Sequence, residues 1–128
     1  MKTVIMAGGK GTRIAELFPD IPKPLIPIKN KDGIEKPVLE WEILSLVSQG
    51  YKDIILTVGY LAEKIQNYFG DGSQLGCHIR YFVEDKPLGN AGALFKLRAE
   101  LGNDPFLLLN ADALFDIDFN RFVVRVDL

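Results

Sequence analysis

The sequence predicts an α/β fold with a mainly parallel β-sheet and helices on both faces. Short apolar runs alternate with amphipathic stretches, in the order strand, loop, helix, strand, helix, strand, helix, strand. Parallel strands joined by helices are connected by right-handed crossovers, which place the helices against the faces of the sheet. The length of 128 residues is near the commonest size of a single domain and is sufficient for a buried core.

Four segments are expected to form the strands. They are residues 3–6, 53–58, 78–83 and 105–109. The first, second and fourth are nearly continuous in β-branched or large aliphatic residues, which is typical of strands buried on both faces.

Three segments are expected to form helices: residues 38–49, 61–69 and 91–101. The first has Pro37 at its first turn and Gly50 as its stop. The second is closed by Gly70, and the third begins after Asn90, a good N-cap residue, and ends before Gly102.

Two further stretches complete this interpretation. Residues 29–36 form a polar loop in which Asp32-Gly33 is a turn signal, and residues 118–124 could begin another helix. An α/β sheet usually continues beyond a buried strand such as the one expected to end at Leu109. We therefore expect the chain, which stops at Leu128, to be the first half of a longer domain or a trimmed one.

The overall composition excludes several classes of function. Fifteen basic and seventeen acidic residues give a net charge of −2, which argues against a nucleic-acid surface. No apolar run approaches the roughly 20 residues that span a bilayer, so no membrane contact is expected. The single cysteine, Cys77, suits a reducing compartment, and a cytoplasmic location is expected.

The stretch MAGGKGTR, residues 6–13, leaves the first predicted strand through a loop rich in glycine. It matches neither the dinucleotide fingerprint G-x-G-x-x-G nor the Walker loop. Glycines still allow backbone N–H groups to converge on a phosphate, and Arg13 could hold phosphate oxygens in a bidentate manner. The alternative is a tight turn between strand and helix with solvated charges.

Two more segments could take part in the same site. In PKPLIPI, residues 22–28, two prolines flank Lys23 and preset its backbone, although a rigid connector would have the same prolines. In EDKPLGNAGAL, residues 84–94, Gly89 allows close approach to a flat ligand. The alternative is that small residues at this helix start pack tightly against the sheet.

A carboxylate follows the last predicted strand, in LLLNADALFDID at residues 107–118. Asp112 lies at the carboxyl end of the sheet, where open α/β folds place ligands, and a single carboxylate there suits Mg²⁺ bound together with phosphate oxygens. Asp116 and Asp118 are interpreted as turn and helix-cap residues. All four segments are expected at one edge of the sheet.

Together, MAGGKGTR, PKP, PLGNAGAL and LNAD resemble the sugar-phosphate nucleotidyltransferases. Within that group the chain resembles the guanylyltransferases that act on mannose-1-phosphate or heptose-1-phosphate. The resemblance runs along nearly all 128 residues and includes TVGYLAEKIQNYFGDG at residues 57–72. It implies a Rossmann-like fold in which residues 1–128 are the nucleotide-binding part of the domain, without the C-terminal part that binds the acceptor.

The resemblance also implies roles for individual residues. The residues expected to bind the nucleotide are Ala7, Gly8, Gly9, Gly11, Thr12, Glu84 and Gly89. Those of the glycine loop would contact the base, ribose and triphosphate, and the last two would lie beside the base. Arg13 and Lys23 are the catalytic candidates, and Asp112 would bind Mg²⁺.

The implied reaction needs no protein nucleophile. The oxygen of a sugar-1-phosphate attacks the α-phosphorus of a nucleoside triphosphate, and pyrophosphate leaves. Glu84 stands where related enzymes often have glutamine, and an ionised carboxylate accepts hydrogen bonds from guanine, so guanine, and hence GTP, is favoured over thymine or uracil. Ala111 and Asn90 also depart from the residues common in the family, with small expected effects.

Two other functions remain open at this stage. The first is a nucleotide sensor with the same fold that binds a nucleotide without turnover. The second is an assembly module, a homo-oligomer formed through an exposed sheet edge. The clustering of Arg13, Lys23 and Asp112 at one edge favours nucleotide chemistry, since an assembly surface has no use for them there.

Overall fold

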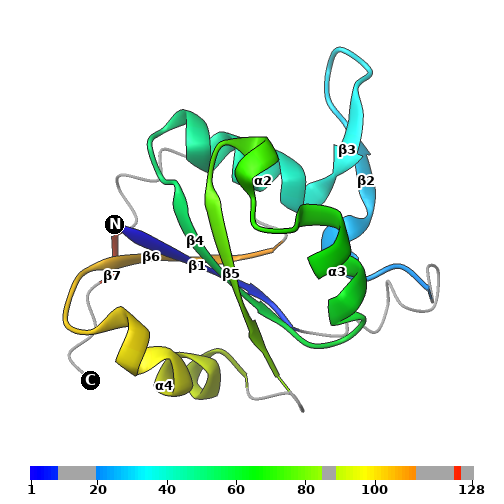
Figure 1. Cartoon of the computed structure of the whole chain (residues 1–128). Helices are drawn as coiled ribbons and strands as arrows, with labels where there is room; N and C mark the ends of the chain where they lie inside the picture. The colour runs from blue at the N-terminus through cyan, green and yellow to red at the C-terminus, as the bar shows by residue number, and fades with distance from the viewer. Residues whose placement is uncertain (9–19, 85–88, 112–122, 125–128) are drawn as a thin grey trace.

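The computed structural model describes residues 1–8, 20–84, 89–111 and 123–124 of the chain. In this part, a sheet has the strand order β5-β4-β1-β6-β7, and a separate hairpin is formed by β2 and β3 (Figure 1). The helices and strands, in chain order, are β1 (Lys2–Ala7), η1 (Lys23–Leu25), β2 (Pro27–Lys29), β3 (Glu35–Pro37), α2 (Val38–Ser48), β4 (Asp53–Val58), α3 (Ala62–Phe69), η2 (Ser73–Leu75), β5 (His78–Val83), α4 (Gly89–Leu101), β6 (Phe106–Asn110) and β7 (Val123–Val124).

The sheet is parallel along its first four strands, as predicted. β1 lies between β4 and β6 and pairs with both in parallel, and β4 also pairs in parallel with β5. β7 is antiparallel to β6. The four strands and three helices predicted from the sequence are therefore confirmed, with ends that shift by no more than two residues.

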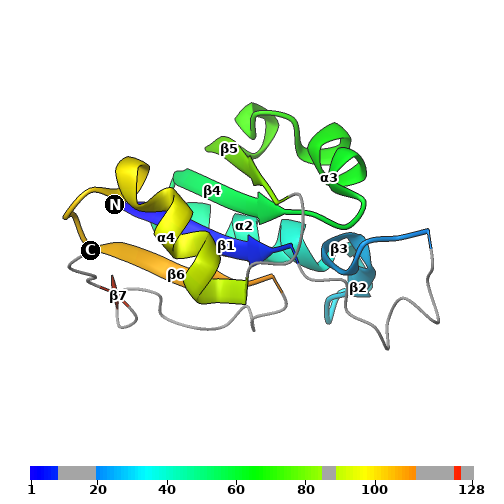
Figure 2. The ribbon, with the colours of Figure 1, turned by 90° about the horizontal axis from the view of Figure 1, so that it is seen from below.

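The side chains of the central strands alternate between two apolar layers. On one face, the strand side chains pack under α2 and α3, and this layer includes Ile5, Leu39, Ile43, Leu46, Ile54, Leu56 and Ile65. On the other face they pack under α4, and this layer includes Val4, Ile55, Leu97, Leu101 and Phe106. Neighbouring residues of one strand point to opposite faces, so continuous apolar runs are what a doubly covered sheet needs. Figure 2 shows α4 crossing the face opposite α2 and α3.

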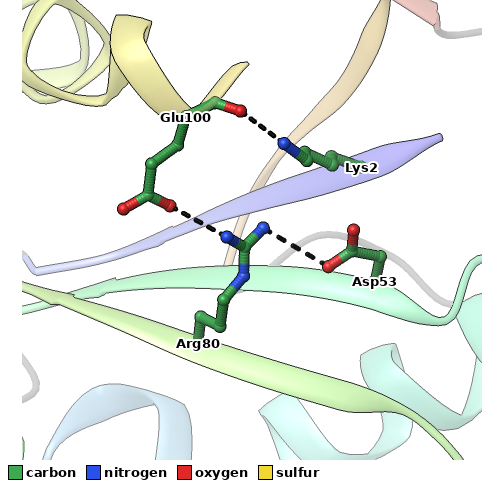
Figure 3. Close-up of polar contacts among 4 residues, drawn as sticks. All are labelled: Lys2, Asp53, Arg80 and Glu100. Carbon is green, nitrogen blue, oxygen red and sulfur yellow. Dashed lines mark hydrogen bonds and ion pairs between the residues drawn. The ribbon is translucent and has the colours of Figure 1, made fainter.

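The amino edge of the sheet is closed by a network of charged side chains (Figure 3). Lys2 begins β1, and its ammonium donates to the carbonyl oxygen of Glu100 in the last turn of α4. The guanidinium of Arg80 on β5 lies 3.5 Å from a carboxylate oxygen of Asp53 and 3.3 Å from one of Glu100. These contacts connect the end of α4 to the starts of the strands beneath it.

The polar loop expected at residues 29–36 is the tip of a β-hairpin. Asn30 organises the turn, because its side-chain oxygen accepts from the N–H groups of Asp32 and Ile34, each at 3.0 Å. Gly33 has a φ of 80°, which glycine adopts without strain. The indole N–H of Trp41 donates to the carbonyl of Ile28 at 2.7 Å and attaches the hairpin to α2.

Two sequence-based expectations are wrong. Asn90 is not the N-cap of the third helix, because α4 begins one residue earlier, at Gly89. The cap preference of asparagine is worth only about 1 kcal/mol, which is too little to fix a helix boundary. Val123 and Val124 form β7 rather than part of a helix, because two β-branched residues pair readily with the open edge of β6.

Candidate functional site

Three neighbouring strands end together at the carboxyl edge of the sheet. β1 is followed by Gly8, β4 by Gly59 and β5 by Glu84. The ladder between β4 and β5 continues one step further, since the N–H of Glu84 donates to the carbonyl of Val58 at 2.7 Å. Two of these three residues, Gly8 and Gly59, have no side chain, so their backbone atoms are accessible to neighbouring groups.

The carboxylate of Glu84 lies directly over Gly8. A Cβ atom built on Gly8 would be 2.0 Å from Oε2 of Glu84, which is far inside contact distance. The backbone of Gly8 does not have a positive φ, so a larger residue here would be opposed not by conformation but by the Glu84 carboxylate, which would have to move aside. The structure thus brings together two of the residues that the sequence predicted for nucleotide binding, Gly8 and Glu84.

The half-buried Glu84 carboxylate is an unusual group for this position. Burial raises its pKa above the ordinary value of a glutamate. Among the described residues, no hydrogen-bond donor or cation contributes to the shift, because desolvation is its one cause. A desolvated carboxylate without donors is costly for the fold, and it is also ready to accept hydrogen bonds from a ligand.

Ala7, another predicted nucleotide-binding residue, is held at the same edge. Its N–H donates to Oγ1 of Thr57 on β4 at 3.3 Å, and the Thr57 hydroxyl in turn lies 3.6 Å from Sδ of Met6. Thr57 is fully buried and fixes the last residues of β1 against β4. The sequence analysis did not single out Thr57, which lies inside an otherwise apolar strand.

The end of β6 is attached to the same edge. The N–H of Ala111 donates to the carbonyl of Met6 at 3.1 Å, which extends the pairing of β6 with β1 by one residue. Asp112 is the next residue in the sequence but lies outside the described residues, as do Gly9, Gly11, Thr12 and Arg13. Their predicted roles remain predictions.

Lys23 begins the 3-10 turn η1, between the buried side chains of Pro22 and Pro24. The turn is closed by the N–H of Leu25 on the carbonyl of Pro22 at 2.9 Å and by that of Ile26 on the carbonyl of Lys23 at 3.2 Å. The backbone of Lys23 is therefore preset, as the flanking prolines predicted.

Gly89, the last of the predicted nucleotide-binding residues, is the first residue of the 13-residue helix α4. The N-terminal end of a helix carries unpaired N–H groups and a partial positive charge. In the part of the chain that the structure describes, no three His, Cys, Asp or Glu side chains lie close enough together to hold a metal ion. Within the same residues, no helix has the length and hydropathy needed to cross a bilayer.

Comparison with known proteins places this arrangement in a family. Residues 2–127 match the nucleotidyl transferase family. The chain is 40% identical to D-glycero-alpha-D-manno-heptose 1-phosphate guanylyltransferase of Campylobacter jejuni, over 94% of the chain and 52% of that protein. It is 39% identical to UTP--glucose-1-phosphate uridylyltransferase of a Synechocystis species, over 96% of the chain and 33% of that protein.

Comparison with solved structures leads to the same family. The crystal structure of HddC from Yersinia pseudotuberculosis in complex with GMP-PN superimposes with a TM-score of 0.78 at 30% identity, over 94% of this chain and 52% of that one. The chain thus spans about half the length, or less, of the relatives that it matches. The resemblance found in the sequence and the α/β fold with a mainly parallel sheet are confirmed. The chain belongs to the nucleotidyl transferase family, and its relatives are sugar-1-phosphate nucleotidyltransferases.

Proposed function

We propose that this member of the nucleotidyl transferase family provides the nucleotide-binding part of a guanylyltransferase. The reaction would transfer GMP from GTP to a sugar-1-phosphate and release pyrophosphate. The observation that carries the choice of guanine is the carboxylate of Glu84, which lies over Gly8 without a donor among the described residues. The heptose-1-phosphate guanylyltransferase of Campylobacter jejuni supports the same choice.

The chemistry of the bases explains why this carboxylate favours guanine. Guanine presents two adjacent donors, N1–H and the 2-amino group, which match the two oxygens of an ionised carboxylate. Uracil and thymine present one N–H between two carbonyl oxygens, and these oxygens would face the carboxylate and repel it. Hydrogen bonds to a charged group are worth about 1.5–3 kcal/mol, so one such pair is enough to set a preference.

The remaining predicted residues would position and neutralise the phosphates. The N–H groups of Gly11 and Thr12 would hold the triphosphate, and Arg13 and Lys23 would stabilise charge at the reacting centre. The attacking phosphate oxygen is already ionised at neutral pH, so no general base is needed. A bond forms from that oxygen to the α-phosphorus as the bond from the α-phosphorus to the pyrophosphate oxygen breaks, in line.

Asp112 is the residue that would hold Mg²⁺. It is the next residue in the sequence after Ala111, whose N–H donates to the carbonyl of Met6 on β1. Mg²⁺ binds through one or two protein carboxylates and completes its shell with phosphate oxygens and water, so a single aspartate fits. When bound, the ion would supply neutralisation of phosphate charge.

The test is a product assay with the whole chain. The chain is incubated with Mg²⁺, each of the four common nucleoside triphosphates and a panel of sugar-1-phosphates, and mass spectrometry measures nucleotide-sugar and pyrophosphate. We expect a GDP-sugar as the main product, and a loss of about 100-fold or more in Asp112→Asn, because metal stabilisation of a phosphoryl transition state is worth several kcal/mol.

The matched control is Asp104→Asn, which removes an exposed carboxylate beyond the C-terminal end of α4. This variant is expected to leave turnover unchanged. Equal product from all four nucleotides would contradict the choice of guanine. Absence of product with intact GTP binding would show that this chain binds the nucleotide without completing the transfer.

A further inference from the structure

Gly59 occupies the central place at the carboxyl edge of the sheet. β4 lies between β1 and β5, so the residue that follows β4 lies between Gly8 and Glu84. A Cβ atom built on Gly59 would be 3.1 Å from the carbonyl oxygen of Gly8. It would also be 3.5 Å from the carbonyl oxygen of Glu84 and 3.8 Å from its Cβ. The chain segments on both sides therefore close around this position.

Conformation does not explain why position 59 is glycine. Six other glycines of the described chain have a positive φ and serve turns or helix ends: Gly33, Gly50, Gly70, Gly72, Gly76 and Gly102. Gly59 and Gly8 have no positive φ, so other residues could adopt their backbone conformation. Both positions are limited by space: a Cβ on Gly8 would meet the Glu84 carboxylate, and a Cβ on Gly59 would meet the carbonyl oxygen of Gly8.

We propose that Gly8 and Gly59 together form a seat for the Glu84 carboxylate and thereby determine which base the site selects. This inference rests on the proposed reading of guanine by Glu84. Gly8 leaves the space that the carboxylate fills, and Gly59 leaves the space that the carbonyl oxygen of Gly8 occupies. Gly59 acts only through these neighbours, so it is a positioning residue.

A methyl group at position 59 has a defined consequence. At 3.1 Å from the carbonyl oxygen of Gly8 it is closer than an ordinary contact, so that carbonyl must shift by a few tenths of an ångström, whereas the distances to Glu84 are ordinary contacts. The Glu84 carboxylate lies over Gly8, so a shift of Gly8 changes the position in which the carboxylate would meet both donors of guanine. Hydrogen-bond pairs of this kind depend on placement to within about 0.5 Å.

A purely structural role for Gly59 would give a different result. Its carbonyl accepts the N–H of Ala62 at 3.1 Å, at the start of α3, so the residue also belongs to the turn between β4 and α3. If that turn were the whole reason for the glycine, a substitution would lower stability and leave base selectivity intact. Selectivity is therefore the informative measurement.

The experiment compares GTP, ITP and UTP binding to the wild-type chain, Gly59→Ala and Gly8→Ala by calorimetry, with thermal unfolding of each. ITP lacks the 2-amino group, so the ratio of GTP to ITP affinity reports one of the two proposed hydrogen bonds. We expect GTP affinity to fall about tenfold in Gly59→Ala, as small misplacements of a binding group cost at least this much. The ratio of GTP to ITP affinity should fall toward one. Val83→Ala is the matched control, because it shortens the exposed side chain next to Glu84 and keeps the β5 backbone.

The outcomes separate this inference from the proposed function. If Gly59→Ala loses stability but keeps its GTP/ITP and GTP/UTP affinity ratios, the proposed role of Gly8 and Gly59 in base selection is wrong. The proposed recognition of guanine by Glu84 is then unaffected. A wild-type chain that binds GTP and UTP equally overturns both. If Gly59→Ala does not fold, Gly8→Ala carries the test, since its added Cβ displaces the far end of the flexible Glu84 side chain. Unchanged ratios in Gly8→Ala then overturn the seat.

Discussion

The two edges of the central sheet use charged residues in opposite ways. At the amino edge, Arg80 bridges Asp53 and Glu100, and Lys2 donates to the end of α4 (Figure 3). At the carboxyl edge, Glu84 lies over a glycine, and burial without any donor among the described residues raises its pKa. Among the described residues, the charged groups of the first edge form ion pairs with one another, and the Glu84 carboxylate at the second edge has no such partner.

The same difference separates the candidate site at the carboxyl edge from a pocket at the amino edge. A hollow of about 410 Å³ lies at the amino edge, lined in part by Lys2, Asp53 and Phe106. Its Lys2 and Asp53 already have partners on the protein. At the carboxyl edge, the Glu84 carboxylate has no donor among the described residues, and it lies beside glycines whose backbone a ligand can approach. This hydrogen-bonding capacity, more than open space, is why the carboxyl edge is the candidate site.

The largest effect is expected from Glu84→Gln, which keeps the shape of the side chain and removes its charge. One amide oxygen replaces two charged acceptors, so GTP affinity should fall about 10- to 100-fold, which corresponds to about 1.5–3 kcal/mol. Stability should not fall, because the raised pKa means that ionised Glu84 lowers the stability of the fold at neutral pH. Calorimetry with GTP and thermal unfolding measure the two effects.

The pH dependence of the same variant provides a check. Guanine binding needs the ionised carboxylate, so wild-type GTP affinity should be complete above the raised pKa of Glu84 and decline as the pH falls through it. The decline should therefore begin at a higher pH than an ordinary glutamate would give. Glu84→Gln should lack this dependence. An identical pH profile in both chains would exclude Glu84 as the titrating group.

Most of the fold could be predicted from the sequence because it depends on repeated local patterns. Buried parallel strands require continuous apolar runs, and these marked β1, β4 and β6. The β2–β3 hairpin was not predicted, because its strands have three residues each and are held by Asn30 and Trp41. The pairing of Val123 and Val124 with β6 was missed because it depends on an open strand edge far away in the sequence.

The candidate site was predictable only in part. Glycines and a carboxylate after predicted strands indicated Gly8 and Glu84, since the ends of parallel strands meet at one edge. Gly59 also directly follows a predicted strand, and that was the available signal for it. Its proximity to Gly8 and Glu84 depends on the strand order β5-β4-β1, which the sequence does not specify. That Glu84 has no donor among the described residues is likewise a property of three-dimensional packing.

A smaller effect, confined to stability, is expected from Arg80→Met at the amino edge. Both ion pairs of Arg80 are partly exposed, and such pairs contribute about 0.2–1 kcal/mol each. Methionine keeps much of the apolar stem and removes the Nε atom, which is buried without a partner among the described residues. We expect a loss of about 1 kcal/mol in the free energy of unfolding, as most of the pairing is removed.

The loss in Arg80→Met should shrink at high salt, where exposed pairs are screened. GTP affinity should be unchanged, because the substitution lies at the opposite end of the strand from Glu84. Urea unfolding at low and high salt measures the first effect, with Glu100→Gln as the second arm of a double-mutant cycle. A tenfold drop in GTP affinity in Arg80→Met would contradict the separation of the two edges.

The smallest effect is expected from Lys2→Met. The ammonium of Lys2 caps a carbonyl in the last turn of α4, where a positive charge interacts favourably with the helix dipole. The contact is exposed, so its loss should lower the free energy of unfolding by about 0.3–0.5 kcal/mol. Lys2→Arg should restore it, since the charge and donor are kept. Hydrogen exchange at the C-terminal end of α4 is the sensitive measurement, because local opening of that turn should increase in Lys2→Met while the central strands keep their protection. Faster exchange in β1 or β4 would instead mean that the amino edge holds the sheet together as a whole, and the contrast between a structural edge and a ligand-binding edge would become sharper still.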